Sequence, residues 1–245
     1  MCTLIVYFRC QADLPLLLAL NRDEYLERPT AAVAAWRPDA TALPILSGRD
    51  LRSGGTWFGI GRHVIAGLTN HRPQSGRSLP GSRSRGDLVV NALQRHDLAA
   101  VRADMERLPM QAYGPFHLLA VDVDADSMLW FSNRDGTLEV SEVQPGLHIL
   151  GNFGLDHQAD PVVAHLQQKL GHTTKWPFDQ LLPHLQQTLA EHGPGRPCIH
   201  REGYGTRSST IYARHADTSA LWLTDAPPCQ QAFEDHTSRC AIISG

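Results

Sequence analysis

The order of apolar segments along the 245 residues predicts an α+β fold in which two sheets are stacked between helical layers. Short apolar runs typical of strands occur within residues 4–21, 56–68, 116–150 and 205–224. Between them, residues 87–108 and 162–191 carry apolar side chains at helical spacing. The sequence shows no internal repeat and no linker, so we expect a single domain.

Composition and charge are those of an ordinary globular protein, with 42% hydrophobic and 19% charged residues. A net charge of −3 gives no electrostatic reason to expect nucleic acid or an anionic membrane as a partner. The start of the chain lacks a secretory signal pattern, and no segment approaches the roughly 18 apolar residues of a membrane span. We therefore expect a cytoplasmic protein without a membrane span. The sequence leaves the oligomeric state open.

The first elements predict a β-hairpin. Residues 4–8 form an apolar run that includes β-branched side chains, which is typical of a buried strand. A short turn at 11–13 separates it from a second apolar run at 14–21. In an antiparallel hairpin the end of the second strand lies beside the start of the first. The polar quartet Asn21-Arg22-Asp23-Glu24 would then lie next to Cys2.

The following segment is less regular. Residues 27–52 are rich in Pro, Ala and Arg and have no clear period, so we expect a surface loop able to cover a site. Gly54-Gly55 predicts a turn and residues 56–60 a short strand. These glycines do not form a phosphate-binding loop, because neither a Lys-Ser/Thr pair nor a helix follows them. A third strand at 63–68 leads into Asn70.

The middle of the chain predicts helices and then further strands. Residues 74–85 are rich in Gly, Ser and Arg and are expected to form a loop that, with 27–52, controls entry to the site. Two short helices are expected at 87–98 and 99–108. Four strands are expected at 116–123, 127–132, 138–143 and 147–150.

The last third predicts two helices and a second hairpin. Asp160-Pro161 supplies an N-cap and a first-turn proline for a helix at 162–170, and 178–191 has the pattern of another amphipathic helix. Residues 205–215 and 219–224 flank a short polar turn and predict a hairpin.

Cys2 is the first candidate for chemistry. It directly follows Met1, and a side chain this small allows an aminopeptidase to remove the methionine, which leaves a free α-amine on the cysteine. That amine, with a pKa of roughly 7.7–8.0, can accept the proton of a thiol whose pKa is about 8.5. One residue would supply both nucleophile and base, as in N-terminal-nucleophile hydrolases. The alternative is that Cys2 is a small hydrophobic residue.

The other cysteines predict no further chemistry. Five cysteines are an odd number, and they are widely spread without a CxxC motif: Cys2, Cys10, Cys198, Cys229 and Cys240. Neither a disulfide framework nor a zinc site is expected. We expect Cys198 and Cys229 to be structural or incidental and Cys240 to lie in a frayed tail.

Residues at four strand ends could assist Cys2. Acyl transfer requires hydrogen-bond donors for the tetrahedral oxyanion, and Asn70 and Asn152 each follow an apolar strand. It also requires a cation that favours the thiolate, for which Arg22 and Arg207 are the candidates. Each residue has the alternative interpretation of an ordinary turn or surface residue.

A carboxylate that orients the amine is the last requirement, and Asp23 or Glu24 could provide it. The alternative for the whole quartet that contains them is a solvated exit from the strand with a surface ion pair.

Several motifs together resemble the NRDE family, also called the transport and Golgi organisation 2 family. They are Met1-Cys2-Thr3, Asn21-Arg22-Asp23-Glu24, Gly54-Gly55-Thr56-Trp57, Gly151-Asn152 and Tyr204-Gly205-Thr206-Arg207-Ser208-Ser209-Thr210. The resemblance covers residues 1 to about 212. It implies an association with haem trafficking and with lipid and coenzyme A metabolism.

More distantly, the chain is similar to choloylglycine hydrolases and penicillin V acylases. Those enzymes also begin Met-Cys, and their fold is a four-layered αββα sandwich of the N-terminal-nucleophile type. The resemblance implies oxyanion roles for Asn70 and Asn152 and a role for Arg207. Their Arg-Asn-x-Asp pattern differs from the quartet here, which leaves the register of the match open. Asp23 is the preferred carboxylate for orienting the amine and Glu24 its alternative, and Arg22 either lines the site or faces away from it.

Two functions follow as expectations. In the first, Cys2 cleaves a linear amide or related acyl bond of a small-molecule substrate and requires no cofactor. The catalytic residues would be Cys2, Asp23, Asn70, Asn152 and Arg207, and the substrate-binding residues Asn21, Arg22, Glu24, Trp57 and His71. In the second, the same fold carries haem or an acyl ligand without turnover, with His63 and His71 as candidate axial ligands.

Overall fold

The computed structural model describes residues 2–72 and 81–244, with side chains described as far as residue 243. Most of the predicted loop 74–85 lies outside the described residues. The chain divides into two compact units. Unit 1 comprises Met1–Glu27, Pro145–Gly151 and Leu155–Cys240, and unit 2 comprises Arg28–Gln144, Asn152–Gly154 and Ala241–Gly245.

Unit 1 is built on an antiparallel sheet with the strand order β10-β1-β2-β12-β13-β14, and β11 pairs with β12. The strands are β1 (Cys2–Phe8), β2 (Leu16–Tyr25), β10 (Gly146–Leu150), β11 (His200–Arg201), β12 (Tyr204–Arg214), β13 (Ser219–Thr224) and β14 (Glu234–Asp235). Both predicted hairpins are confirmed, because β1 pairs with β2 and β12 pairs with β13.

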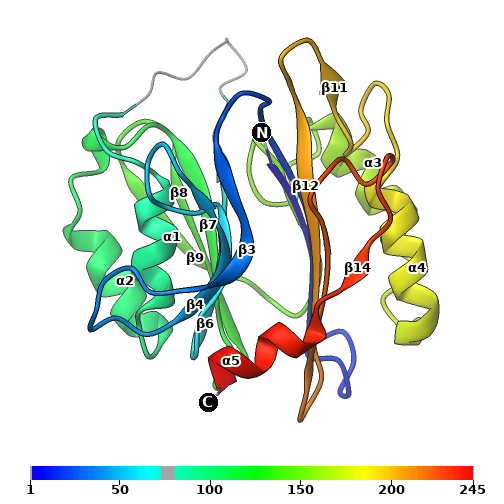
Figure 1. Cartoon of the computed structure of the whole chain (residues 1–245), viewed down its shortest axis with the longest axis horizontal. Helices are drawn as coiled ribbons and strands as arrows, with labels where there is room; N and C mark the ends of the chain where they lie inside the picture. The colour runs from blue at the N-terminus through cyan, green and yellow to red at the C-terminus, as the bar shows by residue number, and fades with distance from the viewer. Residues whose placement is uncertain (1, 73–80, 245) are drawn as a thin grey trace. The chain divides into compact units, whose positions relative to one another are not determined.

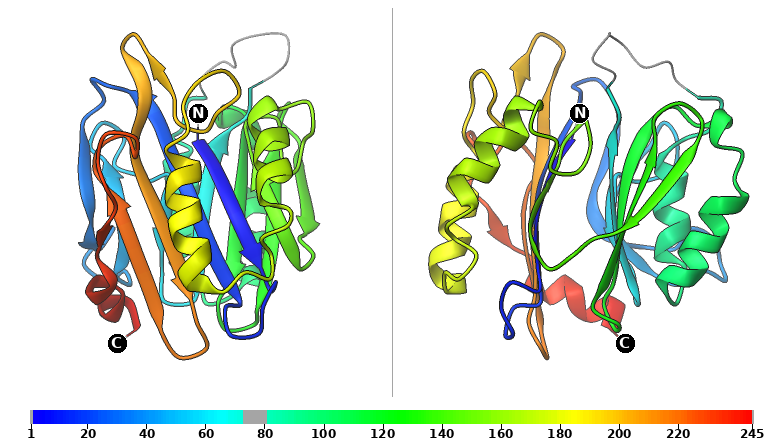
Figure 2. Two further views of the ribbon diagram at one scale, coloured as in Figure 1. Left: turned by 90° about the vertical axis from the view of Figure 1, so that its right-hand side faces the viewer. Right: turned by 180° about the vertical axis from the view of Figure 1, so that it is seen from behind.

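Two helices, α3 (Pro161–Leu170) and α4 (Phe178–Leu189), lie over one face of this sheet (Figure 2). Buried apolar side chains fill the space between helices and sheet: Ile5, Tyr7, Leu17, Ala19, Ile149, Val163, Leu166, Leu170, Leu181, Leu185, Leu189, Ile211 and Ala213 among them. The Asp160 carboxylate accepts hydrogen bonds from the first-turn backbone of α3, so the predicted N-cap is confirmed.

Unit 2 contains a second antiparallel sheet, in the order β3-β4-β5-β6-β7-β8-β9. The strands are β3 (Thr30–Trp36), β4 (Ile45–Asp50), β5 (Phe58–Ile60), β6 (Val64–Asn70), β7 (Phe116–Asp122), β8 (Ser127–Asn133) and β9 (Leu138–Glu142). Helices α1 (Gly86–Leu93) and α2 (Leu98–Arg107) cover one face of it (Figure 1). Their apolar sides pack on Phe116, Leu118 and other buried residues of the sheet.

Short helical turns complete the described elements. They are η1 (Met110–Ala112) and α5 (Ala241–Ser244) in unit 2, and η2 (Thr237–Cys240) in unit 1. Cys240 is 7% exposed, so the expectation that it lies in a frayed tail is wrong. Among the described residues, no helix has the length and apolar character needed to cross a membrane.

The expectation of a loop at 27–52 is also wrong, because this segment contains β3 and β4. The Ala-rich β3 forms the edge of the sheet and is only partly buried, and its register with β4 shifts between Ala31 and Ala34. An edge strand with this composition lacks the apolar alternation that would have identified it. In β4, Ile45 and Leu46 are buried in the sheet.

The boundary between the first two helices lies earlier than expected. Helix α1 ends at Leu93, and the Asp97 side chain caps α2 by accepting a hydrogen bond from the Ala100 N–H at 2.7 Å. The two antiparallel sheets with their helices confirm the α+β class. The single-domain organisation and the finer four-layered arrangement stay predictions.

The adjacent glycines of the predicted turn should tolerate substitution differently. A Cβ at Gly55 would lie 2.5 Å from the Gly86 carbonyl carbon, whereas Gly54 has open space but a φ of 81°. We expect Gly54→Ala to lower the free energy of unfolding by about 1–2 kcal/mol through left-handed strain, and Gly55→Ala to lower it more. Urea denaturation measures both.

The matched control is Gly54→Asn, which should lose less than Gly54→Ala because asparagine tolerates the left-handed conformation. A Gly55→Ala protein as stable as the wild type would contradict the tight contact with Gly86.

Candidate functional site

The β1–β2 hairpin places Cys2 beside the polar quartet, as the sequence predicts. Cys2 is the first residue of β1, and its Cα pairs with that of Arg22 in β2. The quartet does not follow the strand but belongs to it, because β2 continues to Tyr25. Side chains alternate between the two faces of a strand, so Cys2 and Arg22 share a face.

The Cys2 thiol is held in a partly buried position. Its sulfur accepts a hydrogen bond from the backbone N–H of Asp23. Burial raises the pKa of the Cys2 thiol, and the Asp23 carboxylate raises it further, while the Arg22 guanidinium and the hydrogen bond from the Asp23 backbone lower it. The pKa remains raised, so the thiol is protonated near neutral pH and needs a base to become a nucleophile.

Asp23 is a buried carboxyl group next to this sulfur, and only 3% of the residue is exposed. Its Oδ1 accepts a hydrogen bond from the Thr206 hydroxyl at 2.6 Å. Burial raises the pKa of Asp23 to about 7, although the Thr206 hydrogen bond and the charges of Arg201 and Arg22 lower it. A buried carboxyl group that titrates near neutrality beside a thiol is typical of a functional site.

Thr206 belongs to one of the family motifs, but the sequence alone assigns it no role. It pairs with Asp23 across β12 and β2, and the strand bulges immediately after it. The Tyr204 hydroxyl of the same strand donates to the Asp23 carbonyl oxygen at 3.0 Å. Both residues fix the position of Asp23, and only the pairing of distant strands reveals this.

Arg207 lies in the bulge of β12 and binds the backbone where the chain leaves β2. Its Nη1 donates to the carbonyl oxygens of Tyr25 and Leu26 at 3.0 and 2.6 Å. Of the two candidate arginines, Arg22 is therefore the one that pairs with Cys2 and lowers the pKa of its thiol. Glu24 is partly exposed, and its carboxylate accepts a hydrogen bond from the Tyr25 N–H at 2.9 Å.

Asn21 is fully buried and connects three segments of unit 1. Its Nδ2 donates to the carbonyl oxygens of Leu189 and Pro197 at 2.9 and 3.0 Å, and its Oδ1 accepts from the Ser209 hydroxyl. These bonds give Asn21 a structural role at the end of α4.

In unit 2, the two predicted oxyanion residues are in direct contact. Asn70 ends β6, and the Asn152 Nδ2 donates to the Asn70 carbonyl oxygen at 2.7 Å. The Asn152 carbonyl oxygen accepts from the Arg72 N–H at 2.9 Å. Residues 82 positions apart in sequence are thus brought together. Their role in stabilising an oxyanion stays a prediction.

A histidine pair lies next to Asn70. The His71 Nδ1 and the His117 Nε2 are 3.0 Å apart and share a hydrogen bond. His117 is completely buried in β7, and its ring packs beside Trp130 with centroids 5.7 Å apart. The one signal that could have identified His117 in the sequence is a histidine inside an otherwise apolar strand.

The remaining candidates have local contacts. A Cβ added to Gly48 would lie 2.4 Å from the Trp57 ring, so this ring packs closely on β4. The His63 Nδ1 bonds to Asp124 Oδ2 at 2.8 Å. No contact in the described part of the chain distinguishes His63 or His71 as a haem ligand.

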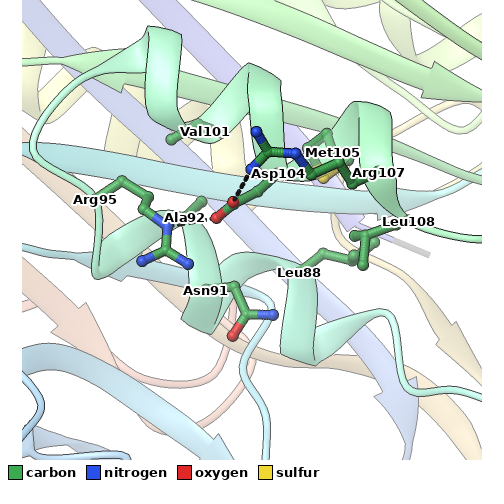
Figure 3. Close-up of a pocket in the computed structure, with 9 residues that line it drawn as sticks. All are labelled: Leu88, Asn91, Ala92, Arg95, Val101, Asp104, Met105, Arg107 and Leu108. Atoms are coloured by element: carbon green, nitrogen blue, oxygen red, sulfur yellow. Dashed lines mark hydrogen bonds and ion pairs between the residues drawn. The ribbon is translucent and has the colours of Figure 1, made fainter.

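A hollow of about 250 Å³ lies between α1 and α2 (Figure 3). Leu88, Ala92 and Val101 line it with apolar atoms, and Asp104 lies at its edge between Arg95 and Arg107. Its lining includes neither a cysteine nor a histidine, so it offers neither the predicted nucleophile nor a histidine ligand for haem.

Comparison with known proteins identifies relatives along most of the chain. A family model described as Transport and Golgi organisation 2 matches residues 1–192. A Transport and Golgi organization protein 2 homolog from Bos taurus is 28% identical over 240 residues, which cover 82% of this chain and 83% of the relative. The homolog from Homo sapiens is 27% identical over 234 residues, with the same coverage of both chains.

Removing the charge of Arg22 should raise the pKa of the Cys2 thiol, because this guanidinium favours the thiolate. We expect Arg22→Gln to move the midpoint of Cys2 alkylation to higher pH. Each unit of increase slows labelling about tenfold at a fixed pH below the midpoint. The measurement is iodoacetamide labelling of the N-terminal peptide across pH, followed by mass spectrometry.

Arg22→Lys is the matched control and should keep most of the wild-type profile. An unchanged midpoint in Arg22→Gln would show that Arg22 does not act on Cys2.

Asp23 should make stability fall as pH rises. Its pKa is about 7 in the folded state and about 3.9 in an unfolded chain, so between these values the folded state binds more protons. We expect the free energy of unfolding to decrease by about 4 kcal/mol from pH ~4 to above pH ~7, relative to Asp23→Asn. Urea denaturation of both proteins at several pH values measures this difference.

The neighbouring variant Glu24→Gln should retain the wild-type decrease. Parallel pH profiles for Asp23→Asn and the wild type would mean that Asp23 is not the titrating group.

Proposed function

The chain belongs to the transport and Golgi organisation 2 family, and from that premise we propose that it is a cysteine-dependent hydrolase of linear amides or related acyl bonds. Cys2 is the nucleophile. The observation that carries the proposal is the contact between the Cys2 sulfur and Asp23, a buried residue whose carboxyl group has a pKa of about 7.

The raised thiol pKa supports a role for an N-terminal base. A thiol that is protonated near neutral pH needs a proton acceptor within reach. The α-amine of Cys2 would be that acceptor, because its ordinary pKa of roughly 7.7–8.0 is close to neutrality. The proposal therefore requires that Cys2 becomes the first residue of the mature protein, and that Asp23 orients its amine.

The reaction proceeds in two steps. The amine takes the thiol proton and the sulfur attacks the acyl carbon, giving a tetrahedral oxyanion that hydrogen-bond donors must stabilise. The oxyanion collapses, the C–N bond breaks, and the α-ammonium donates its proton to the departing amine. A water molecule, deprotonated by the α-amine, then attacks the thioester, and the acid leaves as the thiol is restored.

The architecture of each unit supports the N-terminal-nucleophile type of fold. Each unit consists of one antiparallel sheet with helices on one face, and these are the parts from which an αββα sandwich is built. Cys2 is the first residue of an interior strand of its sheet rather than part of a loop. A strand gives a nucleophile a rigid support.

An acyl probe tests the nucleophile. We expect an activated thioester of a simple fatty acid to acylate the wild-type protein once, at Cys2, after intact mass has shown that Met1 is removed. Cys2→Ser should lose at least about 100-fold in acylation rate, since the hydroxyl has a far higher pKa than the thiol. Cys10→Ser, which changes another partly buried cysteine, should react as the wild type does.

An insertion variant tests the amine separately. Placing one alanine between Met1 and Cys2 keeps the thiol but removes the α-amine from Cys2. Deacylation should slow by about 100-fold or more, the usual contribution of a general base. A protein that retains Met1, resists the probe and binds haem tightly in a Soret titration would instead support the carrier function.

A further inference from the structure

Four side chains with metal-binding atoms meet in unit 1, away from Cys2. They are His192, Cys198, His200 and Cys229. The ligand atoms of His192, His200 and Cys229 all lie within 4.8 Å of one another. The Cys198 sulfur lies 3.6 Å from the His200 Nε2 and 3.6 Å from the Cys229 sulfur.

We propose that these two cysteines and two histidines form a zinc site. Two thiolates and two imidazoles are a common ligand set for structural zinc, which they bind in a tetrahedral arrangement. Four protein ligands fill the coordination sphere, so the site would be structural rather than catalytic. Its ligands come from three segments: the loop after α4, the strand β11 and the turn after β13.

The separations among Cys198, His200 and Cys229 lie within about 0.5 Å of the edges of a tetrahedron around zinc. Bond lengths of about 2.3 Å to sulfur and 2.0–2.1 Å to nitrogen put two sulfurs about 3.8 Å apart, and a sulfur and a nitrogen about 3.6 Å apart. The observed separations are 3.6 Å between the sulfurs, 3.6 Å from Cys198 to His200, and 3.1 Å from Cys229 to His200. The sulfurs are well beyond the roughly 2.05 Å of a disulfide bond.

The backbone holds the first three ligands in place. The Cys198 N–H donates to the Glu191 carbonyl oxygen at 2.9 Å, which places Cys198 beside His192. Cys198 and His200 are two residues apart in extended chain, so their side chains point to the same face. His200 pairs with Gly205 of β12, which fixes the hairpin that carries it (Figure 1).

Cys229 is positioned by a turn of its own. The N–H groups of Gln230 and Gln231 donate to the Pro227 carbonyl oxygen at 2.8 and 3.1 Å. The Gln231 side chain accepts from the Asp225 N–H at 3.1 Å and closes the turn. All four ligands are thus fixed by backbone contacts that do not depend on a metal.

The burial of the four side chains suits a site that a zinc ion can enter from solvent. Cys198 is 1% exposed and forms the base, Cys229 is partly buried, and both histidines are exposed. The histidine rings face each other edge to face, with centroids 5.6 Å apart. Exposed histidines have no apolar reason to gather around two thiols, whereas a shared cation would provide one.

A zinc ion at this site would also stabilise the position of Thr206, which hydrogen bonds to Asp23. Ile199 lies between two ligands, and its N–H donates to the Thr206 hydroxyl oxygen at 2.8 Å. The same hydroxyl donates to Asp23 Oδ1 at 2.6 Å. Zinc would therefore hold the segment that positions Thr206.

Zinc titration of the metal-free full-length protein tests the proposal. We expect one zinc ion per chain by native mass spectrometry, and a cobalt-substituted protein with thiolate charge-transfer and tetrahedral d–d absorption. Cys229→Ser and His200→Ala should each weaken zinc binding at least tenfold in competition with a chromophoric chelator. Cys10→Ser and His96→Ala, which change a cysteine and an exposed histidine elsewhere, should bind as the wild type does.

The outcomes are distinct even where a variant is unstable. His192→Ala removes a third, exposed ligand and should also lose affinity if Cys229→Ser fails to fold. Absence of bound zinc, equal affinity in all variants, an octahedral cobalt spectrum or a Cys198–Cys229 disulfide in the purified protein would overturn the proposal. Cys2→Ser should bind zinc normally, so this site and the Cys2 chemistry are tested independently.

Discussion

The antiparallel pairing of β1 with β2 is the constraint on which the candidate site depends. Seven consecutive pairs, from Cys2 with Arg22 to Phe8 with Leu16, set one register for both strands. A slip by one residue would turn Cys2 to the opposite face from Arg22. The register is held because Ile5, Tyr7, Leu17 and their neighbours must stay in the apolar layer beneath α3 and α4.

A second strand pairing determines the electrostatics. Because β12 pairs with the other edge of β2, Thr206 lies opposite Asp23 and hydrogen bonds to its carboxylate. Burial raises the pKa of Asp23 to about 7 even so. When the Asp23 carboxyl group is ionised in this buried position, it lowers the free energy of unfolding. Buried groups with shifted pKa values that reduce stability in this way are common at functional sites. The same Thr206 hydroxyl connects Asp23 to Ile199, between two proposed zinc ligands.

The two proposals rest on different properties of cysteine. Cys2 offers a reactive group at a strand end, where its sulfur is partly buried and contacts the backbone of Asp23. Cys198 and Cys229 lie close to each other and to two imidazoles, an arrangement in which sulfur acts as a ligand. Whether a cysteine is proposed as a nucleophile or as a metal ligand thus depends on which groups the fold places beside its sulfur.

The sequence by itself determined the α+β class, both hairpins of unit 1, the cap of α3 and the approach of the quartet to Cys2. These features depend on local patterns, which neighbouring residues specify through turn chemistry and burial. The sequence did not predict the edge strand β3, because this strand is only partly buried and has no alternation of apolar and polar residues.

Only the tertiary structure decided which polar groups meet. The contact of Asn70 with Asn152 and the bond from Thr206 to Asp23 join segments far apart in the chain. Cys229 is likewise brought from a distant turn to the neighbouring residues His192, Cys198 and His200. Short sequence patterns do not predict contacts between distant residues, because these contacts depend on the order of the strands in each sheet and on turns in different parts of the chain. The pKa of Asp23 belongs to the same class, since burial by distant residues sets it.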